Sequence, residues 1–148
     1  MLAVATLGAC SATGSPAAGQ ERIANVDRSG LSNLVVGGGC FWCLEAAYEI
    51  VPGVKDVELG YAGGTRQNPS YEQVMTKTTG HAEVVQVTYD PGKVTYQQLV
   101  DWFWRNVDPL DAKGQFCDKG SPYRSAIFYH GEEQKKVASA SKQALEAS

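Results

Sequence analysis

Apolar residues recur along the chain with two periods, one typical of strands and one typical of helices. A short apolar run at 34–36 predicts a buried strand, and residues 57–61 alternate between apolar and polar as a half-buried strand does. The clearest strand prediction covers residues 82–90, and another strand is expected at 125–130. These segments are predicted to build one sheet.

Helical periods lie between the predicted strands. Residues 41–51 place four apolar side chains on one face, and Pro52 with Gly53 ends that helix. Two later helices are each introduced by a capping box, a Ser or Thr followed three residues later by Gln. Ser70 opens a short helix from Tyr71 to about Lys77, and Thr95 opens the next helix. A charged, Ala-rich helix is expected at 132–147.

Helices that alternate with strands predict an α+β fold, a two-layer α/β sandwich of the ferredoxin-like kind. With 148 residues, the chain is long enough for one domain with a proper core, expected at 31–148. Residues 106–124 show no periodicity, and loops beyond about 12–15 residues are usually functional or disordered. Because this loop contains aromatic residues, it is predicted to lie over a site.

The first thirty residues differ from the rest. Residues 1–9 are short and mostly apolar, and 11–20 have the Ser, Ala, Gly and Pro content of a flexible tether. Leu7 to Cys10 resembles a bacterial lipobox, although no Lys or Arg precedes the apolar stretch as a signal normally requires. A lipidated Cys10 would anchor the protein to a membrane in the cell envelope or periplasm. The alternative is a disordered N-terminus with an incidental cysteine and a cytoplasmic protein.

Composition narrows the function classes. The hydrophobic content of 43%, the charged content of 20% and the net charge of −3 are those of an ordinary soluble protein. The sequence has no basic stripe of the kind that binds nucleic acid, and no apolar run approaches membrane-spanning length. The four cysteines are too few for a disulfide scaffold, so metal or redox chemistry is expected.

The densest chemical signal is the run from Gly37 to Cys43. It places a glycine turn after a strand and a cysteine, Cys40, at the first turn of a helix. A helix N-terminus stabilises negative charge, and the thiolate is the reactive form of cysteine. Cys43 follows one helical turn later, and Phe41 with Trp42 lies between the two thiols.

Glu83 is the second unusual position. Strand alternation places it on the same face as Val85, Val87 and Tyr89, so its carboxyl group is predicted to point inward. Burial raises the pKa of a carboxyl group, and a protonated Glu near neutral pH can act as a general acid. The pattern alone leaves open a strand-end Glu that reaches solvent or pairs with a lysine.

Several motifs occur together in a fixed order. Their sequences are Gly39-Cys40-Phe41-Trp42, Gly60-Tyr61 with Gly63-Gly64, Asn68-Pro69-Ser70-Tyr71, Gly80-His81-Ala82-Glu83, Tyr89-Asp90-Pro91, and Asp118 to Ser125. Together they resemble the peptide-methionine (S)-S-oxide reductase family, the A-type methionine sulfoxide reductases. The resemblance runs from about Leu34 to Ser148, and it implies an enzyme that reverses one epimer of methionine sulfoxide.

The resemblance implies catalytic roles. Cys40 would attack the sulfur of methionine sulfoxide, free or in proteins, and Glu83 would protonate the departing oxygen. Tyr71 and Tyr123 match the two tyrosines that hydrogen-bond this oxygen. Without the resemblance, the two tyrosines read equally well as core residues with satisfied hydroxyl groups.

The resemblance also implies a substrate pocket. Phe41 and Trp42 match the apolar wall that holds the terminal methyl group of the substrate. Asp118 matches a position that orients the substrate backbone, and His81, beside the acid, would have a supporting part in binding. The family needs no bound cofactor, and a monomer is expected.

The resulting sulfenic acid on Cys40 needs a second thiol to form a disulfide. The family often uses a cysteine in a C-terminal tail, and the sequence stops at Ser148, where family members usually continue. The internal candidates are Cys43, ranked first because it is one turn away, and Cys117, ranked second. Thioredoxin is the family's usual reductant.

Two other functions fit part of the sequence. A thiol–disulfide oxidoreductase would use the Cys40–Cys43 pair, but it would leave Glu83 and the tyrosines unexplained. A structural zinc module would use Cys40, Cys43, Cys117 and His81, although structural zinc sites normally show paired short spacings.

Overall fold

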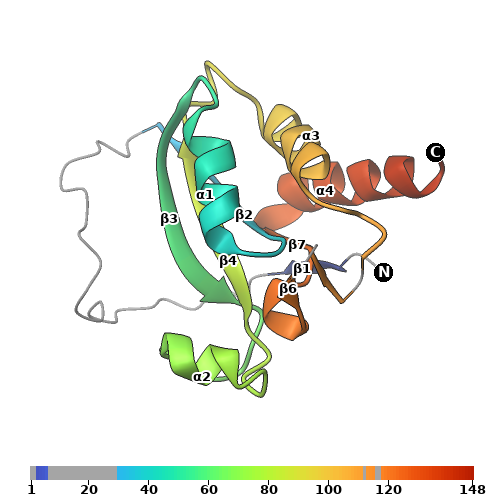
Figure 1. Ribbon diagram of the computed structural model, residues 1–148. Coiled ribbons are helices and arrows are strands. Elements are labelled where there is room, and N and C mark those ends of the chain that lie inside the picture. Colours follow the sequence, from blue (N-terminus) through green and yellow to red (C-terminus); the bar gives the residue numbers. More distant parts are fainter. Residues whose placement is uncertain (1–2, 7–29, 112, 116–117) are drawn as a thin grey trace.

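The computed structural model describes residues 3–6, 30–111, 113–115 and 118–148 (Figure 1). Its main sheet has five strands in the order β1-β7-β2-β4-β3. The pairs β7–β2, β2–β4 and β4–β3 are antiparallel, and β1 pairs in parallel with β7. The strands are β1 (Ala3–Thr6), β2 (Ser32–Gly37), β3 (Val54–Ala62), β4 (Ala82–Tyr89) and β7 (Ala126–Tyr129).

Four α-helices and a small hairpin complete the described part of the chain. The helices are α1 (Phe41–Glu49), α2 (Tyr71–Met75), α3 (Tyr96–Asn106) and α4 (Gly131–Glu146). The hairpin pairs β5 (Gly114–Gln115) with β6 (Asp118–Lys119), and a 3-10 turn, η1 (Ser121–Tyr123), follows it. No helix among the described residues is long and apolar enough to cross a membrane.

The main core lies between the sheet and three helices. Apolar side chains of β2 and β4 pack there against α1, α3 and α4, so these helices cover one face of the sheet (Figure 1). The opposite face has a smaller cluster that includes Val35, Val84 and Phe128. Helix α2 lies apart from the helical layer, beyond the ends of β3 and β4, and only Val74 of its residues is fully buried.

The predicted elements are confirmed, with differences at their ends. Helix α1 ends at Glu49, and both predicted capping boxes are formed, at Ser70 and Thr95. Helix α2 ends at Met75, before the predicted end at about Lys77. Lys77 has a left-handed backbone conformation with φ 62°, and a right-handed helix cannot continue through such a residue. The irregular segment 106–124 contains the hairpin and η1, whose few residues carry no periodic signal.

The sequence did not predict β1. Its four residues are apolar or β-branched, and that composition suits a strand as well as the apolar part of a signal. The broad prediction of a single α/β domain is confirmed, and the structure adds that the sheet is mainly antiparallel. Cys10 and Cys117 lie outside the described residues.

Candidate active site

The glycine turn after β2 is packed so tightly that side chains are excluded. A Cβ atom at Gly37 would lie 2.7 Å from the carbonyl oxygen of Glu83, a distance that real Cβ atoms essentially never show. Gly39 has φ 76°, and a Cβ atom there would lie 2.7 Å from the Cβ of Gln115. The turn therefore fixes where the next residue, Cys40, enters α1.

Cys40 is the N-cap residue of α1. Its backbone is extended, with φ −67° and ψ 125°, and its carbonyl oxygen accepts from the N–H of Cys43 at 3.1 Å. The side chain makes no capping hydrogen bond and is partly buried. The predicted position of this thiol at a helix N-terminus is therefore confirmed, in the place where backbone N–H groups favour a negative charge.

Glu83 brings a carboxyl group to the same helix end. Its side chain is only 2% exposed, and Oε2 accepts a hydrogen bond of 3.1 Å from the backbone N–H of Phe41, the residue after Cys40. The other residues on its face of β4, Val85 and Val87, belong to the main core. The inward position is confirmed, and the solvent-exposed alternative is wrong.

Burial is the main influence on the pKa of the Glu83 carboxyl group. It raises the pKa of Glu83 above its ordinary value, the hydrogen bond from Phe41 opposes the rise, and the charge of Asp118 adds to it. A raised pKa favours the protonated form, in which the group can donate a proton to a neighbouring oxygen.

A phenol group from the neighbouring strand lies beside Glu83. Tyr61 is paired with Glu83 across β3 and β4, so the two side chains lie on the same face of the sheet. Burial raises the pKa of Tyr61 to about 12, with contributions from the charges of Glu83, Tyr71 and Tyr123. Phenols that hold their protons this firmly are hydrogen-bond donors at neutral pH.

Tyr123 and Tyr71 come from outside the sheet. Tyr123 ends η1, and its carbonyl oxygen accepts a 3.0 Å hydrogen bond from the N–H of Gly39. Burial raises the pKa of Tyr123, and the charges of Glu83, Tyr71 and other neighbours, including Cys40, raise it further. Tyr71 begins α2 and is 47% exposed. Neither tyrosine is a fully buried core residue, in contrast to the alternative left open by the sequence.

Two aromatic side chains stand beside the thiol. Phe41 is buried in the main core, while Trp42 is 62% exposed. The Phe41 ring centroid lies 5.9 Å from that of Trp42 and 5.8 Å from that of Tyr61. The Phe41 ring therefore contacts both of the others, and the exposed end of this group of rings is Trp42, two residues after Cys40.

Cys43 contacts Cys40 through its backbone N–H, and its thiol lies near enough to feel the charge of Cys40. Burial, the charge of Cys40, a hydrogen bond between the two thiols and the charge of Asp118 all raise the pKa of Cys43. Cys43 is exposed. Cys40 and Cys43 are thus brought together, while the position of Cys117 lies outside the described residues.

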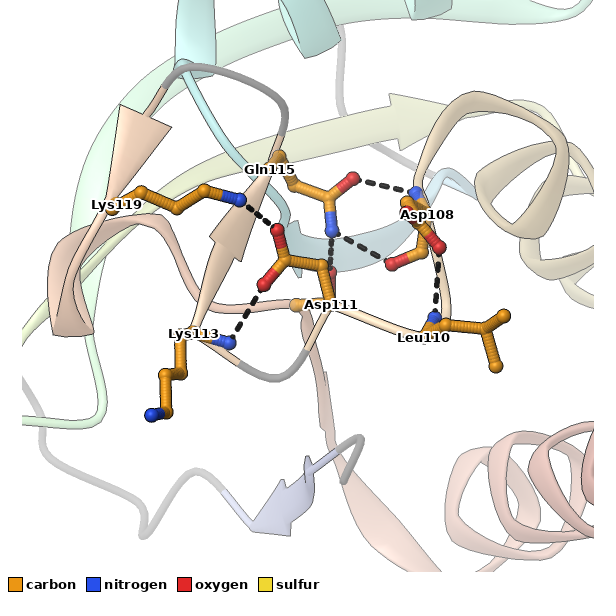
Figure 2. A network of polar contacts seen from close by, with 7 residues as sticks. Asp108, Leu110, Asp111, Lys113, Gln115 and Lys119 are labelled. Atoms are coloured by element: carbon orange, nitrogen blue, oxygen red, sulfur yellow. Dashed lines mark hydrogen bonds and ion pairs between the residues drawn. The ribbon is translucent and has the colours of Figure 1, made fainter.

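The loop that carries Asp118 is held together by the Gln115 side chain (Figure 2), which also lies against Gly39. The Gln115 side chain accepts from the N–H of Asp108 at 2.5 Å, and it donates to the Asp108 carbonyl oxygen at 2.8 Å and to Ser125 Oγ at 2.9 Å. An ion pair between Lys119 and Asp111 closes the same loop. Asp118 therefore has a fixed place, from which its charge acts on Glu83, Cys43 and Tyr123.

His81 has a different environment from the other predicted site residues. Its Nδ1 accepts from the N–H of Gly64 at 3.2 Å, so Nε2 is the protonated nitrogen and donates to the carbonyl oxygen of Arg66 at 2.6 Å. Both ring nitrogens hold the backbone of the turn after β3. Among the described residues, no cluster of three or more His, Cys, Asp or Glu residues could hold a metal ion.

A scan of family models matches residues 32–148 to the model described as peptide methionine sulfoxide reductase. That span contains every site element described above. The chain belongs to this family. The match includes the glycine turn, both strands that carry Glu83 and Tyr61, and the loop from Asp108 to Ser125.

Curated relatives carry the same family name. MsrA of Bacillus velezensis is 52% identical over 111 residues, which are 75% of this chain and 63% of the relative. MsrA of Listeria monocytogenes is 47% identical over 121 residues, 82% of this chain and 68% of the relative. The chain thus spans about two thirds of the length of the curated relatives it matches.

Solved structures of the family have the same fold. Methionine sulfoxide reductase A of Corynebacterium diphtheriae superposes with a TM-score of 0.75 at 36% identity, covering 78% of this chain and 56% of that one. Reduced Mxr1 of Saccharomyces cerevisiae gives 0.77 at 31% identity, covering 83% and 72%.

Three residues of this family member had no site prediction from the sequence: Tyr61, Met75 and Gln115. Alternation along 57–61 placed Tyr61 on the inner face, but only the pairing of β3 with β4 brings it opposite Glu83. The sulfur of Met75 accepts a hydrogen bond from the Tyr123 hydroxyl group. Gln115 is 2% exposed and lies in a segment without periodicity. Their sequence neighbourhoods carry no signal of these contacts.

Proposed function

We propose that this family member reduces the S-epimer of methionine sulfoxide, free or in proteins, to methionine. The observation that carries the proposal is the hydrogen bond from Phe41 N–H to Glu83. It puts a buried carboxyl group, whose pKa is raised, at the helix end where the Cys40 thiol begins α1. A thiol that attacks a sulfoxide needs a nearby acid that protonates the sulfoxide oxygen.

The first step transfers oxygen from substrate to enzyme. The Cys40 thiolate attacks the sulfoxide sulfur and forms an S–S bond, while Glu83 protonates the oxygen, which cannot leave without a proton. The resulting hydroxyl group then passes to the Cys40 sulfur as the S–S bond to the substrate breaks. The products are methionine and a sulfenic acid on Cys40, so the substrate sulfur is reduced by two electrons and the cysteine sulfur is oxidised by two.

Neighbouring side chains bind the substrate in this proposal. Tyr71 and Tyr123 donate hydrogen bonds to the oxygen as negative charge develops on it, and Asp118 orients the substrate backbone. Phe41 and Trp42 hold the methyl group. The other epimer would place its oxygen against these rings, where it would lose its hydrogen bonds, so the site selects one hand of the substrate.

The second step forms a disulfide and releases water. Cys43 is the first candidate for the attacking thiol, since it lies one helical turn from Cys40 and the charge of Cys40 acts on its thiol. Cys117 is the second candidate. A thioredoxin-type dithiol would then reduce the disulfide, and yeast Mxr1 has been solved in complex with Trx2.

The test is an assay of both epimers of a blocked methionine sulfoxide with dithiothreitol as reductant. Turnover of the S-epimer alone supports the proposal, and Cys40→Ser should abolish it. No turnover of the S-epimer by the intact protein would overturn the proposal. Insulin reduction in the same preparation measures the competing thiol–disulfide activity of the Cys40–Cys43 pair.

We also propose that the fold is ferredoxin-like and that residues 31–148 form the catalytic unit, which acts as a monomer. The strand order β7-β2-β4-β3, with α1 and α3 as crossover helices, is that of a split βαβ arrangement and supports this assignment. Residues 1–30 are proposed to be a signal and tether that place the enzyme in the cell envelope. That proposal predicts a mature protein that begins at a lipidated Cys10 and has lost β1 from the edge of the sheet, whereas an intact Met1 with unmodified Cys10 would contradict it.

A further inference from the structure

The hydroxyl group of Tyr123 already has a partner within the chain. It donates a hydrogen bond to the thioether sulfur of Met75, with 3.3 Å between oxygen and sulfur. Tyr123 ends η1, and Met75 is the last residue of α2, so the contact joins two elements that are distant in sequence. A second bond, from Lys77 Nζ to the carbonyl oxygen of Lys119 at 2.9 Å, holds the same two segments together.

This contact lies within the candidate site. The groups whose charges act on the Tyr123 hydroxyl are Glu83, Tyr71, Asp118 and Cys40. Under the proposed function, the same hydroxyl group must donate to the oxygen of the substrate. Met75 therefore occupies the hydrogen bond that the substrate needs, and the substrate must displace it.

The strength of that competition depends on the oxidation state of Met75. A thioether is a weak acceptor, so a sulfoxide substrate takes the Tyr123 hydroxyl from it easily. Oxidation would place a polar, strongly accepting oxygen on the Met75 sulfur, beside the same donor. The competitor would then have the same chemical group as the substrate.

Met75 is also placed where an oxidant can reach it. Its side chain is partly exposed, and it belongs to a helix of five residues in which only Val74 is fully buried. Hydrogen peroxide oxidises a thioether directly: the sulfur lone pair forms the S–O bond as the O–O bond breaks. The sulfur loses two electrons, and the peroxide is reduced to water.

We propose that Met75 is an oxidation site that regulates the enzyme: its sulfoxide engages the Tyr123 hydroxyl group and withholds it from the substrate. The inference rests on the proposed function, because it assigns Tyr123 the same role in substrate binding. The regulation is direct, since the modified atom and the catalytic donor are hydrogen-bonded to each other.

Two variants at Met75 test the proposal without the complication that the enzyme would reduce its own sulfoxide. Met75→Gln supplies a permanent carbonyl acceptor of similar reach, and Met75→Leu supplies no acceptor. With blocked methionine S-sulfoxide and dithiothreitol, we expect Met75→Leu to match or exceed the wild-type kcat/KM. Met75→Gln should be about 2- to 10-fold lower, the effect of one neutral hydrogen bond. Equal kcat/KM values for Met75→Gln and Met75→Leu would overturn the proposal.

A double-mutant cycle separates this mechanism from a packing effect. In a Tyr123→Phe background there is no hydroxyl group to withhold, so the ratio between the Met75→Leu and Met75→Gln variants should fall to about 1. A ratio that persists in this background would mean that the introduced glutamine acts through packing and would contradict the inference.

Chemical modification tests the site itself. Cys40→Ser protein is treated with limiting hydrogen peroxide and digested, and the mass of the peptide containing Met75 is measured. Addition of one oxygen atom is expected. An unmodified Met75, under conditions that oxidise a free peptide of residues 71–79, would refute the assignment. Wild-type turnover in the same assays is the control, because its absence would count against the proposed function rather than against Met75.

Discussion

Cys40 and Glu83 lie where α1 and β4 meet the main core, whereas Tyr71 and Tyr123 lie on two short elements outside it. The thiol and the acid are positioned by backbone groups: the packed turn after β2 and the N–H of Phe41. The segment that carries Tyr71 is joined to the segment around η1 by two side-chain hydrogen bonds, and the Tyr123 hydroxyl group takes part in one of them. The groups proposed to react are thus held more firmly than the groups proposed to bind.

This difference has a thermodynamic meaning. Elements with few buried apolar contacts open locally at a lower free energy than the core does. We therefore expect substitutions on the thiol–acid side to change the chemical step or global stability, and substitutions on the tyrosine side to change substrate binding.

The largest effect is expected at Cys40. Cys40→Ser removes the attacking sulfur and should lower turnover by at least about 1,000-fold, as loss of a covalent nucleophile does. Cys43→Ser is the informative comparison. The Cys43→Ser variant should still form about one methionine per enzyme molecule without reductant. It should not form the Cys40–Cys43 disulfide, because it lacks the second thiol.

Quenched single-turnover samples and a mass map of the disulfides measure both outcomes. A Cys40–Cys117 bridge with a free Cys43 thiol in the wild type would reverse the ranking of the two candidate thiols.

Glu83→Gln should separate activity from stability. The loss of the acid should lower kcat/KM by roughly 10²- to 10⁴-fold. The amide oxygen can still accept from Phe41 N–H, and the cost of burying a charge disappears. Glu49→Gln, an exposed position on α1, is the matched control and should change little.

The pH dependence of stability gives a second readout for Glu83. Because burial raises its pKa when the protein folds, its stabilising contribution is complete below the ordinary value of 4.5 and is lost as pH rises through the folded value. Urea unfolding should therefore show the wild type losing stability relative to Glu83→Gln as pH increases above about 4.5. A constant difference between the two proteins across this range would contradict a raised pKa.

Gln115→Ala should weaken the link that the Gln115 side chain makes between Asp108 and Ser125. It leaves the N–H of Asp108 and the buried hydroxyl group of Ser125 without their partner, so we expect the free energy of unfolding to fall by about 1–3 kcal/mol. Gln97→Ala removes an exposed contact with Asp101 and should cost no more than about 0.5 kcal/mol. Similar unfolding free energies for the two variants would show that the link is unimportant.

The smallest effects compare two capping boxes of the same design. Thr95 is the N-cap of α3, a helix that packs in the core. Thr95→Ala should lower global stability by about 1 kcal/mol with little change in KM. Ser70 is the N-cap of α2. Ser70→Ala should change global stability less, but it should raise KM about 2- to 5-fold because α2 carries Tyr71. The opposite assignment of the stability and KM effects would remove the distinction between the two regions.

Most of the secondary structure could be predicted because its signals are local. The capping boxes at Ser70 and Thr95, the alternation through 82–90 and the glycine turn each depend on neighbouring residues, and all appear as expected. Glu83 could be placed on the inner face for the same reason. Its exact partner, the N–H of Phe41, depends on how β4 lies against α1, and the sequence pattern does not contain that information.

The remaining site residues depend on contacts between distant segments. Tyr61 is a site neighbour only through its register with Glu83, and Gln115 only through a loop that folds back on Gly39. His81 illustrates the opposite case: its position beside Glu83 in sequence suggested substrate binding, but its ring faces the turn after β3. Sequence proximity to the acid does not show which groups a side chain contacts, because contacts across the sheet and its turns decide that.

The packing of Gly39 has a consequence for the order of events during synthesis. A chain emerging from the ribosome presents Cys40 first, while Gln115 and Tyr123, which close on Gly39, are made later. The nascent thiol therefore exists before its acid, its loop and its hydrogen-bond donors have been made. Domains fold as units once enough chain is available, so this cysteine gains its chemical surroundings only after Tyr123 has been made.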